Sequence, residues 1–427
     1  MINRKKSGLL PPSFNCFMIE FEKKTLSNGL RVIVHPDPTS EIAALNLVYD
    51  VGARDEDPKR TGFAHLFEHL MFGGSANIPE FDRPLQEVGG ENNAFTTNDI
   101  TNYYMTLPAA NLETGFWLES DRMLNLAFSE KSLEVQRQVV IEEFKQRYLN
   151  QPYGDLWMLL RPLIYKQHPY RWPTIGQEVR HIEEATMADV KEFFHLHYRP
   201  NRAVLSVVGK VEPNHVFELA EKWFGPIPAD THYQRQLAQE PEQKAYRRQE
   251  VEREVPVNSF HLAFHMGGRN EENYQTVDLI SDLLGRGKSS RLYPLVREKQ
   301  LFSQVGAFVS GSLDPGVLMV SGKLQAGVAF DDAEKAVWDV LHELSTQGPN
   351  DEELEKVINK VESSLVFAEI NGLNKAMNLG SFELHGDAGD INHEIEKYRQ
   401  VSKANIQQQA TQVLRRENAS SLWYKAL

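Results

Sequence analysis

The chain has 427 residues, a length that predicts two domains rather than one. With 41% hydrophobic and 25% charged residues, its composition is that of an ordinary globular protein, and no apolar run reaches the length of a membrane span. The net charge of −13 opposes binding to a phosphate backbone or an anionic bilayer, so we expect neither nucleic acid nor membrane as a partner.

Residues 1–17 have a basic start followed by a Pro-Pro pair, and they contain no continuous apolar stretch. This pattern predicts a disordered extension and not a secretory signal, because a signal peptide needs an uninterrupted apolar region. A cytoplasmic location follows as an expectation. Translation is compatible with a start at either Met1 or Met18, where the strand-like pattern opens.

The first half of the chain alternates strand-like and helix-like segments. From Thr25 to Tyr49, turn residues at 27–29 separate runs rich in β-branched residues, which predicts a hairpin. Apolar residues at helical spacing predict a helix over 62–72. The other elements expected in this half are a hairpin formed by 91–97 and 101–108 and helices over about 111–125 and 131–149.

A polar, Pro-containing stretch without apolar periodicity predicts a linker over residues 225–246. The order of elements then repeats, with a strand at 258–266, helices at 273–285 and 289–301, a hairpin between 304 and 324 and further long helices. The junction VGARDED (51–57) also resembles MGGRNEE (266–272). We therefore expect an α+β fold of two duplicated α/β-sandwich domains, 18–224 and 247–427, each a mixed sheet covered by helices.

The segment 62–72 contains the pattern H-x-x-E-H. At positions i and i+4 of a helix, His65 and His69 lie one turn apart on one face and can converge on one metal ion. Glu68 borders that face and can reach a water molecule held by the metal. Such a metal activates the water and polarises a scissile carbonyl, while the carboxylate accepts the water proton and passes it to the leaving amine. The pattern also arises by chance, so a further ligand is needed.

A catalytic zinc ion takes three protein ligands and keeps one position open. The only cysteine, Cys16, excludes a site built on several thiolates, so the missing ligand should be a His or a carboxylate on a neighbouring helix. The helical segment 134–147 offers Glu142 and Glu143 beside an apolar stripe. An acidic pair of this kind is equally typical of a solvated helix edge.

At several separated places the sequence resembles the pitrilysin peptidases, the family of insulin-degrading enzyme and the mitochondrial processing peptidase. In that family the H-x-x-E-H motif is followed by a Glu in an R-x-V-V-x-x-E context that completes the zinc site. The matching residues here are Arg137, Val139, Val140 and Glu143. The resemblance implies Zn²⁺ held by His65, His69 and Glu143, with Glu142 as an unused neighbour.

The family also shows a G-G-x-x-N-A-x-T stretch, which Gly89, Gly90, Asn93, Ala94 and Thr96 reproduce. In the family this stretch is an edge strand near the metal, to which a substrate peptide adds through backbone hydrogen bonds. The resemblance therefore implies that Asn93, Ala94 and Phe95 bind substrate. It covers almost the whole chain from Met18 onwards, and the zinc motif is its most specific part.

Two positions depart from the family pattern. An additional Glu that family members often carry upstream of the metal-binding Glu is Gln136 here. Active single-chain members also present an Arg and a Tyr from the second domain to hold the substrate and its developing oxyanion. Arg297 matches the Arg, but the Tyr position is Gln304. Because some relatives divide these groups between two subunits, we expect a homo- or heterodimer with a similar subunit that carries the Arg–Tyr pair.

No histidine occurs between His265 and His342, so we expect no zinc in the second domain. The function that the resemblance implies is that of a zinc-dependent endopeptidase, which cleaves peptides or unfolded segments in a chamber enclosed by the two domains. The first alternative is a non-catalytic or partner-dependent subunit of a processing-peptidase-like complex. The second is a metal-dependent hydrolase of non-peptide substrates, which the edge-strand residues disfavour.

Overall fold

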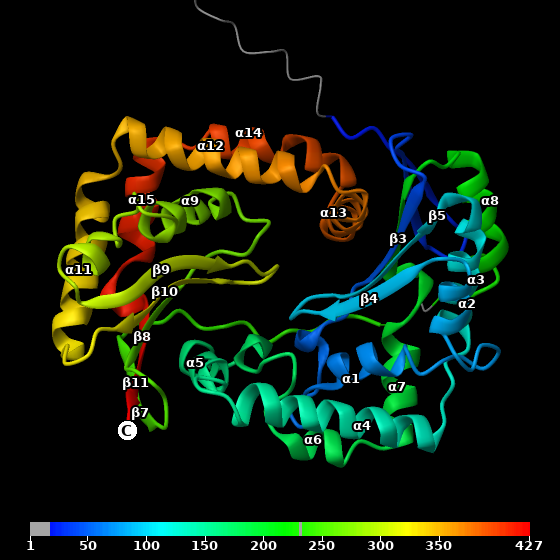
Figure 1. The fold of residues 1–427 in the computed structure, drawn as a ribbon, viewed down its shortest axis with the longest axis horizontal. Helices are drawn as coiled ribbons and strands as arrows, with labels where there is room; N and C mark the ends of the chain where they lie inside the picture. Colours follow the sequence, from blue (N-terminus) through cyan, green and yellow to red (C-terminus); the bar gives the residue numbers. More distant parts are fainter. Residues whose placement is uncertain (1–17, 230–232) are drawn as a thin grey trace, which may run out of the picture.

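The computed structural model describes residues 18–229 and 233–427 and arranges them in two halves, each built on one β-sheet (Figure 1). The first sheet has six strands in the order β1-β2-β6-β3-β5-β4, and β2 and β6 form its parallel pair. Its strands are β1 (Glu22–Thr25), β2 (Arg31–Pro36), β3 (Ile42–Tyr49), β4 (Glu91–Thr96), β5 (Thr101–Pro108) and β6 (Ala203–Gly209). The extension predicted for residues 1–17 lies outside the described residues.

The second sheet has five strands in the order β7-β11-β8-β10-β9, and β7 and β11 form its parallel pair. Its strands are β7 (Arg247–Arg253), β8 (Ser259–His265), β9 (Phe302–Ser310), β10 (Val317–Leu324) and β11 (Ala419–Ala426). From β2 to β4 the first sheet repeats this order and these strand directions, and β1 is an addition at its other edge. The fold is thus a duplication with two mixed sheets, as predicted.

Apart from α5 and α13, the helices of each half pack with its own sheet around a large apolar core. Those of the first half are α1 (Phe63–Leu70), α2 (Asp82–Glu87), α3 (Leu112–Leu124), α4 (Glu130–Phe144), α5 (Leu156–Ile164), α6 (Val179–Glu183), α7 (Met187–His197) and α8 (Pro213–Phe224). Those of the second half are α9 (Tyr274–Gly285), α10 (Pro294–Arg297), α11 (Phe330–Gln347), α12 (Asp351–Ala368), α13 (Gly372–His385), α14 (Glu394–Arg399) and α15 (Lys403–Val413). Among the described residues, no helix combines the length and apolar character needed to cross a membrane.

The two halves exchange one helix each. Helix α13 of the second half lies on the first sheet, where Leu379 joins an apolar cluster with Val204 of β6 (Figure 1). Helix α5 of the first half lies on the second sheet, where Leu160 joins a cluster with Leu422 of β11. Strands β3, β6 and β8 are consequently buried on both faces. Each half therefore contributes to the core of the other.

The turn between β9 and β10 adds a polar contact between the halves. Asp314 accepts a hydrogen bond of 2.8 Å from Arg54, and the Leu313 N–H donates to Asp99 at 3.0 Å. Arg54 is 5% exposed, so its ion pairs with Asp99 and Asp314 are largely shielded from water. This turn links the second half to the β4–β5 turn of the first.

Most predicted elements are present, and two predictions were wrong. The turn at 27–29 joins β1 to β2, whereas β2 and β3 do not form a hairpin, because β6 lies between them. The helix predicted over 289–301 is reduced to α10: Pro294 starts a new helical turn, and Gln300, with φ of 50°, prevents its continuation. The predicted linker 225–246 falls between α8 and β7, where the described residues form no helix or strand.

Candidate metal centre

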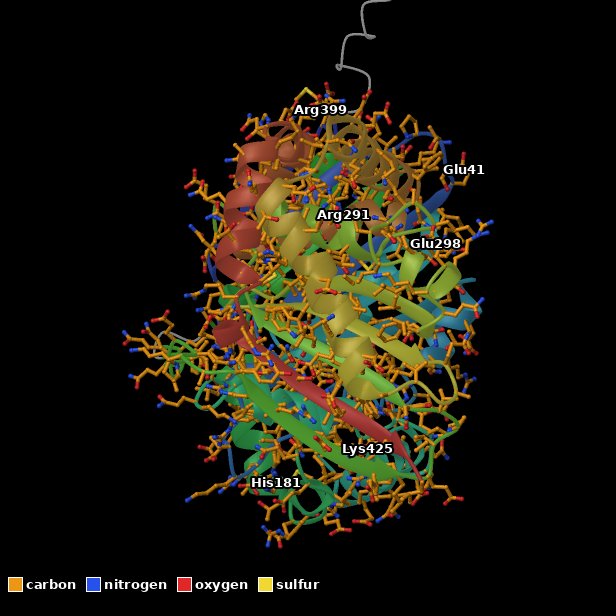
Figure 2. All side chains as sticks on the ribbon, turned by 90° about the vertical axis from the view of Figure 1, so that its left-hand side faces the viewer. Glu41, His181, Arg291, Glu298, Arg399 and Lys425 are labelled. Atoms are coloured by element: carbon orange, nitrogen blue, oxygen red, sulfur yellow. The ribbon has the colours of Figure 1, made fainter. Side chains whose placement is uncertain are left out.

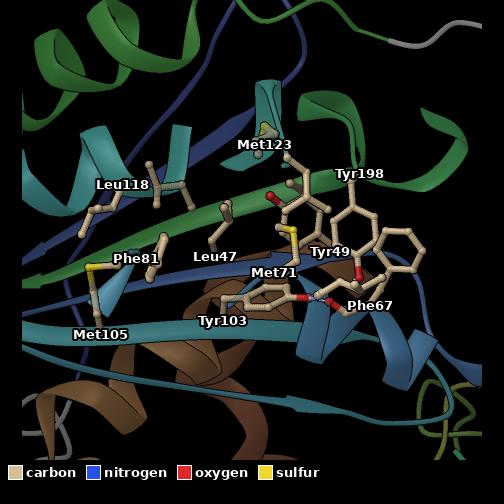
Figure 3. Close-up of a cluster of buried hydrophobic side chains, with 14 of the residues drawn as sticks. Leu47, Tyr49, Phe67, Met71, Phe81, Tyr103, Met105, Leu118, Met123 and Tyr198 are labelled. Carbon is tan, nitrogen blue, oxygen red and sulfur yellow. Dashed lines mark hydrogen bonds between the residues drawn. The ribbon is translucent and has the colours of Figure 1, made fainter. Parts of the chain in front are cut away.

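Helix α1 is held in place by its apolar face. Phe67 packs against Tyr198, with 5.3 Å between ring centroids, and its carbonyl accepts a hydrogen bond of 3.4 Å from Tyr103 (Figure 3). The helix starts at Gly62, where φ is 91° and an added Cβ would lie 2.6 Å from the Ile175 carbonyl oxygen. Only glycine fits this start, and the aromatic contacts hold the buried face of α1 against the core.

The other face of α1 carries His65 and His69, and α4 brings Glu143 to both. Glu143 Oε2 lies 3.3 Å from His69 Nε2 and 3.7 Å from His65 Nε2. The two imidazole rings stand nearly perpendicular, with 4.8 Å between centroids. Among the described residues these three form the single cluster of His, Cys, Asp and Glu side chains with the spacing of a metal site. The structure thus brings together the three residues predicted as zinc ligands.

The electrostatics of this cluster suit a cation. Burial lowers the pKa of His65 to about 4, so its imidazole is neutral near pH 7 and keeps a lone pair for a metal. The hydrogen bond to His69 lowers the pKa of Glu143, which therefore stays ionised. Within the described residues His65 Nδ1 is buried without a hydrogen-bond partner. Two imidazoles and one carboxylate match the donor set of catalytic zinc sites, so the residues present fit this metal.

Glu68 stands beside the cluster but not within it. Burial raises the pKa of this half-buried carboxyl, and neighbouring Glu143 adds to the rise, while Thr96 and His69 oppose it. A carboxylate whose pKa is moved toward neutrality is better suited to accept and release a proton. Since Thr96 ends β4, Glu68 lies close both to the predicted ligands and to the edge strand.

The two acidic residues of α4 differ in orientation. The Glu142 side chain is 58% exposed and pairs with Lys145, whereas that of Glu143 is 18% exposed and faces the imidazoles. Gln136 is half-buried on the same helix. Arg147, one turn after Glu143, pairs with its second carboxylate oxygen at 2.9 Å. Arg147 was not predicted as a site residue, although its i, i+4 spacing from Glu143 is that of a helical ion pair.

Strand β4 is the free edge of the first sheet, adjacent to α1 (Figure 1). Along it Asn93 and Phe95 are exposed and Ala94 is partly buried, in the alternation of a strand with one open face. An edge strand has unpaired backbone donors and acceptors, to which another extended chain can add. The structure therefore places these three predicted substrate-binding residues on an available edge near the His–Glu cluster.

Arg297 and Gln304 belong to the second half and are both exposed. Arg297 ends α10, and Glu298, the next residue, lies at the molecular surface (Figure 2). Gln304 lies on β9, the edge strand of the second sheet. Among the described residues, no hydrogen bond or ion pair joins either side chain to the His–Glu cluster.

Comparison with known sequences adds an independent result. Residues 31–166 match the model of the insulinase family, peptidase family M16, and residues 184–361 match the M16 inactive domain. The chain is 32% identical to zinc protease PqqE of Helicobacter pylori over 352 residues, 80% of this chain and 78% of that protein. It is 27% identical over 368 residues to YmxG of Bacillus subtilis, named an uncharacterized zinc protease, covering 85% of this chain and 88% of that protein.

Solved structures share the fold. A protease from Helicobacter pylori superimposes with a TM-score of 0.90 at 27% identity, over 96% of this chain and all of that one (100%). Pitrilysin superimposes with a TM-score of 0.79 at 17% identity, over 95% of this chain and 45% of pitrilysin. The second match shows the fold alone.

Fold and sequence together define a duplicated metallopeptidase-type scaffold. The chain belongs to the insulinase family of peptidases, family M16. His65, His69 and Glu143 all lie in the segment that matches the peptidase model, and Arg297 and Gln304 lie in the segment that matches the inactive domain. The division of the chain into a half with the cluster and a half without it thus agrees with the family.

Proposed function

We propose that this protein is a zinc-dependent endopeptidase that hydrolyses peptides or unfolded polypeptide segments. The observation that carries the proposal is the convergence of His65, His69 and Glu143 beside Glu68, at the end of an open edge strand. Both relatives are named zinc proteases, and these names support the choice of metal and of reaction. The enclosed chamber predicted between the two domains is part of the same proposal.

In this proposal His65, His69 and Glu143 would hold the zinc ion. When bound, zinc supplies Lewis acidity to the scissile carbonyl and to the attacking water. Arg147 restrains Glu143 through its second oxygen, so that the first remains directed at the imidazoles. Such support of a ligand by a neighbouring group is a general feature of metal sites.

Glu68 is the proposed general base. Its carboxylate accepts the proton of the attacking water and then delivers it to the amine of the departing peptide. Its partial burial favours this role, because desolvation makes the carboxylate a stronger base than it would be in water.

A peptide substrate is favoured by the position of β4. An extended segment that adds along Asn93, Ala94 and Phe95 would place its backbone beside Glu68, because Thr96 ends the strand next to that carboxylate. Recognition through backbone hydrogen bonds suits substrates that are unfolded or short. A hydrolase of non-peptide substrates would not need an open edge strand to recognise its substrate.

We further propose that the active form is a dimer with a similar subunit that supplies an Arg–Tyr pair. The support is the exposure of Arg297 and the presence of Gln304 where the family pattern has Tyr. Gln304 has an amide where a phenol would donate, and its shorter side chain reaches less far toward the developing oxyanion. The alternative is that the chain is a non-catalytic partner of such a complex, and the complete His–Glu cluster argues against it.

The proposal is tested by assaying the purified chain, alone and with candidate partner chains, against a mixed peptide library with and without a chelator. We expect chelator-sensitive cleavage that rises when a partner chain is added. Cleavage that persists at full rate after complete removal of metal would contradict the proposal. Zinc binding without cleavage in every combination would favour the non-catalytic alternative.

A further inference from the structure

Glu56 is a buried acidic residue that the metal centre described above does not use. It is 6% exposed and follows η2 (Ala53–Asp55), in the loop between β3 and α1. One carboxylate oxygen accepts the N–H of Gly62 and the other that of Ala64, both at 2.9 Å. Among the described residues Glu56 has no Lys or Arg partner. Its two oxygens instead bond the start of α1, and the Trp172 side chain also interacts with this carboxyl.

This contact supplies a cap that α1 otherwise lacks. The first N–H groups of a helix have no partner within the helix and are commonly bonded by a Ser, Thr, Asp or Asn at the N-cap position. At this position α1 has Gly62, which has no side chain, and no side-chain cap is present. Glu56 performs the capping from a separate loop through both of its oxygens, and its burial raises the pKa of this carboxyl to about 8.

The same loop is attached to the turn that follows β4. The N–H groups of Ala53 and Arg54 donate to the carbonyls of Thr97 and Asn98, at 3.1 and 2.9 Å. The Ala53 carbonyl in turn accepts a hydrogen bond of 2.9 Å from the Trp172 indole. Glu56 therefore connects the start of α1 to the loop that contains Ala53 and Arg54. Through the hydrogen bonds of this loop it also connects α1 to the end of the edge strand β4.

This cap lies close enough to the metal ligands to affect their position. Helix α1 has 8 residues, a little over two turns, and Ala64 directly precedes His65. A small rotation or axial shift at the start of so short a helix displaces the His65 imidazole relative to Glu143, because the two lie on different helices. Burial of a carboxyl without a cation is unfavourable by itself, so a compensating role is expected.

We propose that Glu56 is a positioning residue for the metal centre: by bonding both Gly62 and Ala64, it sets the rotation and axial position of α1 that direct His65 toward the shared ion. This inference rests on the proposed function, since it concerns the zinc ligands assigned there. It adds a residue that touches neither metal nor substrate.

The test compares Glu56→Gln with the unaltered chain. The amide keeps the size of the side chain but directs an NH₂ group at one of the two backbone N–H groups. Zinc affinity is measured by competition with a chromogenic chelator, and the site geometry by the visible spectrum of the cobalt-substituted protein. We expect zinc affinity to fall about tenfold or more, as for other groups that orient ligands, with an altered cobalt spectrum. Ser402→Ala, which removes the N-cap of α15 in the other half, is the matched control and should change neither readout.

A structural role without positioning predicts something different. If Glu56 only stabilises the fold, Glu56→Gln lowers the unfolding temperature of the metal-free protein while zinc affinity and cobalt spectrum stay unchanged, and the inference is overturned. If Glu56→Gln does not fold, Glu56→Asp, which withdraws the carboxylate by one methylene, takes its place with the same criteria. Failure of the unaltered chain to bind zinc would instead overturn the proposed function and this inference with it.

Discussion

The two halves of the chain use equivalent helices for different purposes. In both, a strand leads through a related junction, VGARDED (51–57) or MGGRNEE (266–272), into a helix and then a hairpin. In the first half α1 has 8 residues and turns His65 and His69 toward Glu143. In the second half α9 has 12 residues, carries no histidine and is almost entirely buried.

The faces of these helices are satisfied in different ways. On α9, Asp278 accepts a hydrogen bond from Tyr398 at 2.6 Å, and Asp282 pairs with Arg286 at 3.0 Å. Helices α12 and α15 pack against α9 as well. The duplicated scaffold therefore folds in the second half without any His–Glu cluster. We therefore expect that removal of the cluster from the first half leaves the fold intact.

The largest expected effect comes from removing both histidines. His65→Ala combined with His69→Ala should abolish stoichiometric zinc binding and peptide cleavage, because one carboxylate alone cannot hold the ion. The unfolding temperature of the metal-free protein should change little, as the second half folds without equivalent residues. Zinc per chain is measured by elemental analysis, with His195→Ala, a change of an exposed histidine on α7, as the control. Full zinc occupancy in the double variant would contradict the assignment of His65 and His69 as ligands.

Glu68→Gln should have the next largest effect, and on activity alone. Loss of a general base lowers turnover by about a hundredfold to ten-thousandfold. Zinc content and fold should remain, since Glu68 stands beside the ligands and not among them. Steady-state cleavage of a fluorogenic peptide, together with metal analysis, measures both. An equal loss of zinc would make Glu68 a ligand.

The inactive-domain half is tested through Gln304. Gln304→Tyr should raise cleavage by the isolated chain, because loss of one oxyanion donor costs about a hundredfold or more in related cases. Ser303→Tyr is the matched control, since neighbouring strand residues point to opposite faces.

Addition of the partner chain should raise turnover of the unaltered protein with little change in its zinc content. Robust cleavage by a demonstrated monomer, indifferent to any partner, would contradict the proposed dimer.

The smallest expected effect concerns the contact between the halves. Burial alone would raise the pKa of Asp314, but His168 and Arg54 lower it to about 2. A depressed carboxyl pKa contributes stability above the ordinary pKa, and this contribution is lost as pH falls toward 2. Asp314→Asn should lower the free energy of unfolding by about 1–2 kcal/mol at pH 7 and remove this acid-dependent part. Denaturant unfolding at several pH values measures both, and parallel curves for the two proteins would refute it.

Local pattern was enough to predict part of the site. The spacing of His65 and His69 predicts their convergence, because i and i+4 fix a shared face whatever surrounds the helix. The choice between Glu142 and Glu143 depends on how α4 is rotated against α1, a tertiary property that the spacing alone leaves open. The family resemblance favoured Glu143, and in the structure Glu143 faces the imidazoles.

Features that depend on distant partners left little trace in the sequence. The insertion of β6 between β2 and β3 could not be predicted, because an apolar sequence pattern indicates a strand but not which strands pair with it. The exchange of α5 and α13 could not be predicted for the same reason. An apolar helix face indicates that the helix is packed, but not which sheet it packs against. Glu56 gave no signal because its partners are backbone N–H groups, which every residue but proline carries.

The central claim, that the first half holds one zinc ion through α1 and α4, is tested most directly by a matched pair on α4. Glu143→Gln and Glu142→Gln make the same chemical change at adjacent positions, one facing the imidazoles and one facing solvent. Zinc per chain after dialysis against a weak chelator is the measurement. We predict that Glu142→Gln retains one zinc and Glu143→Gln loses it. Equal zinc content in the two variants, or loss in Glu142→Gln alone, would contradict the account.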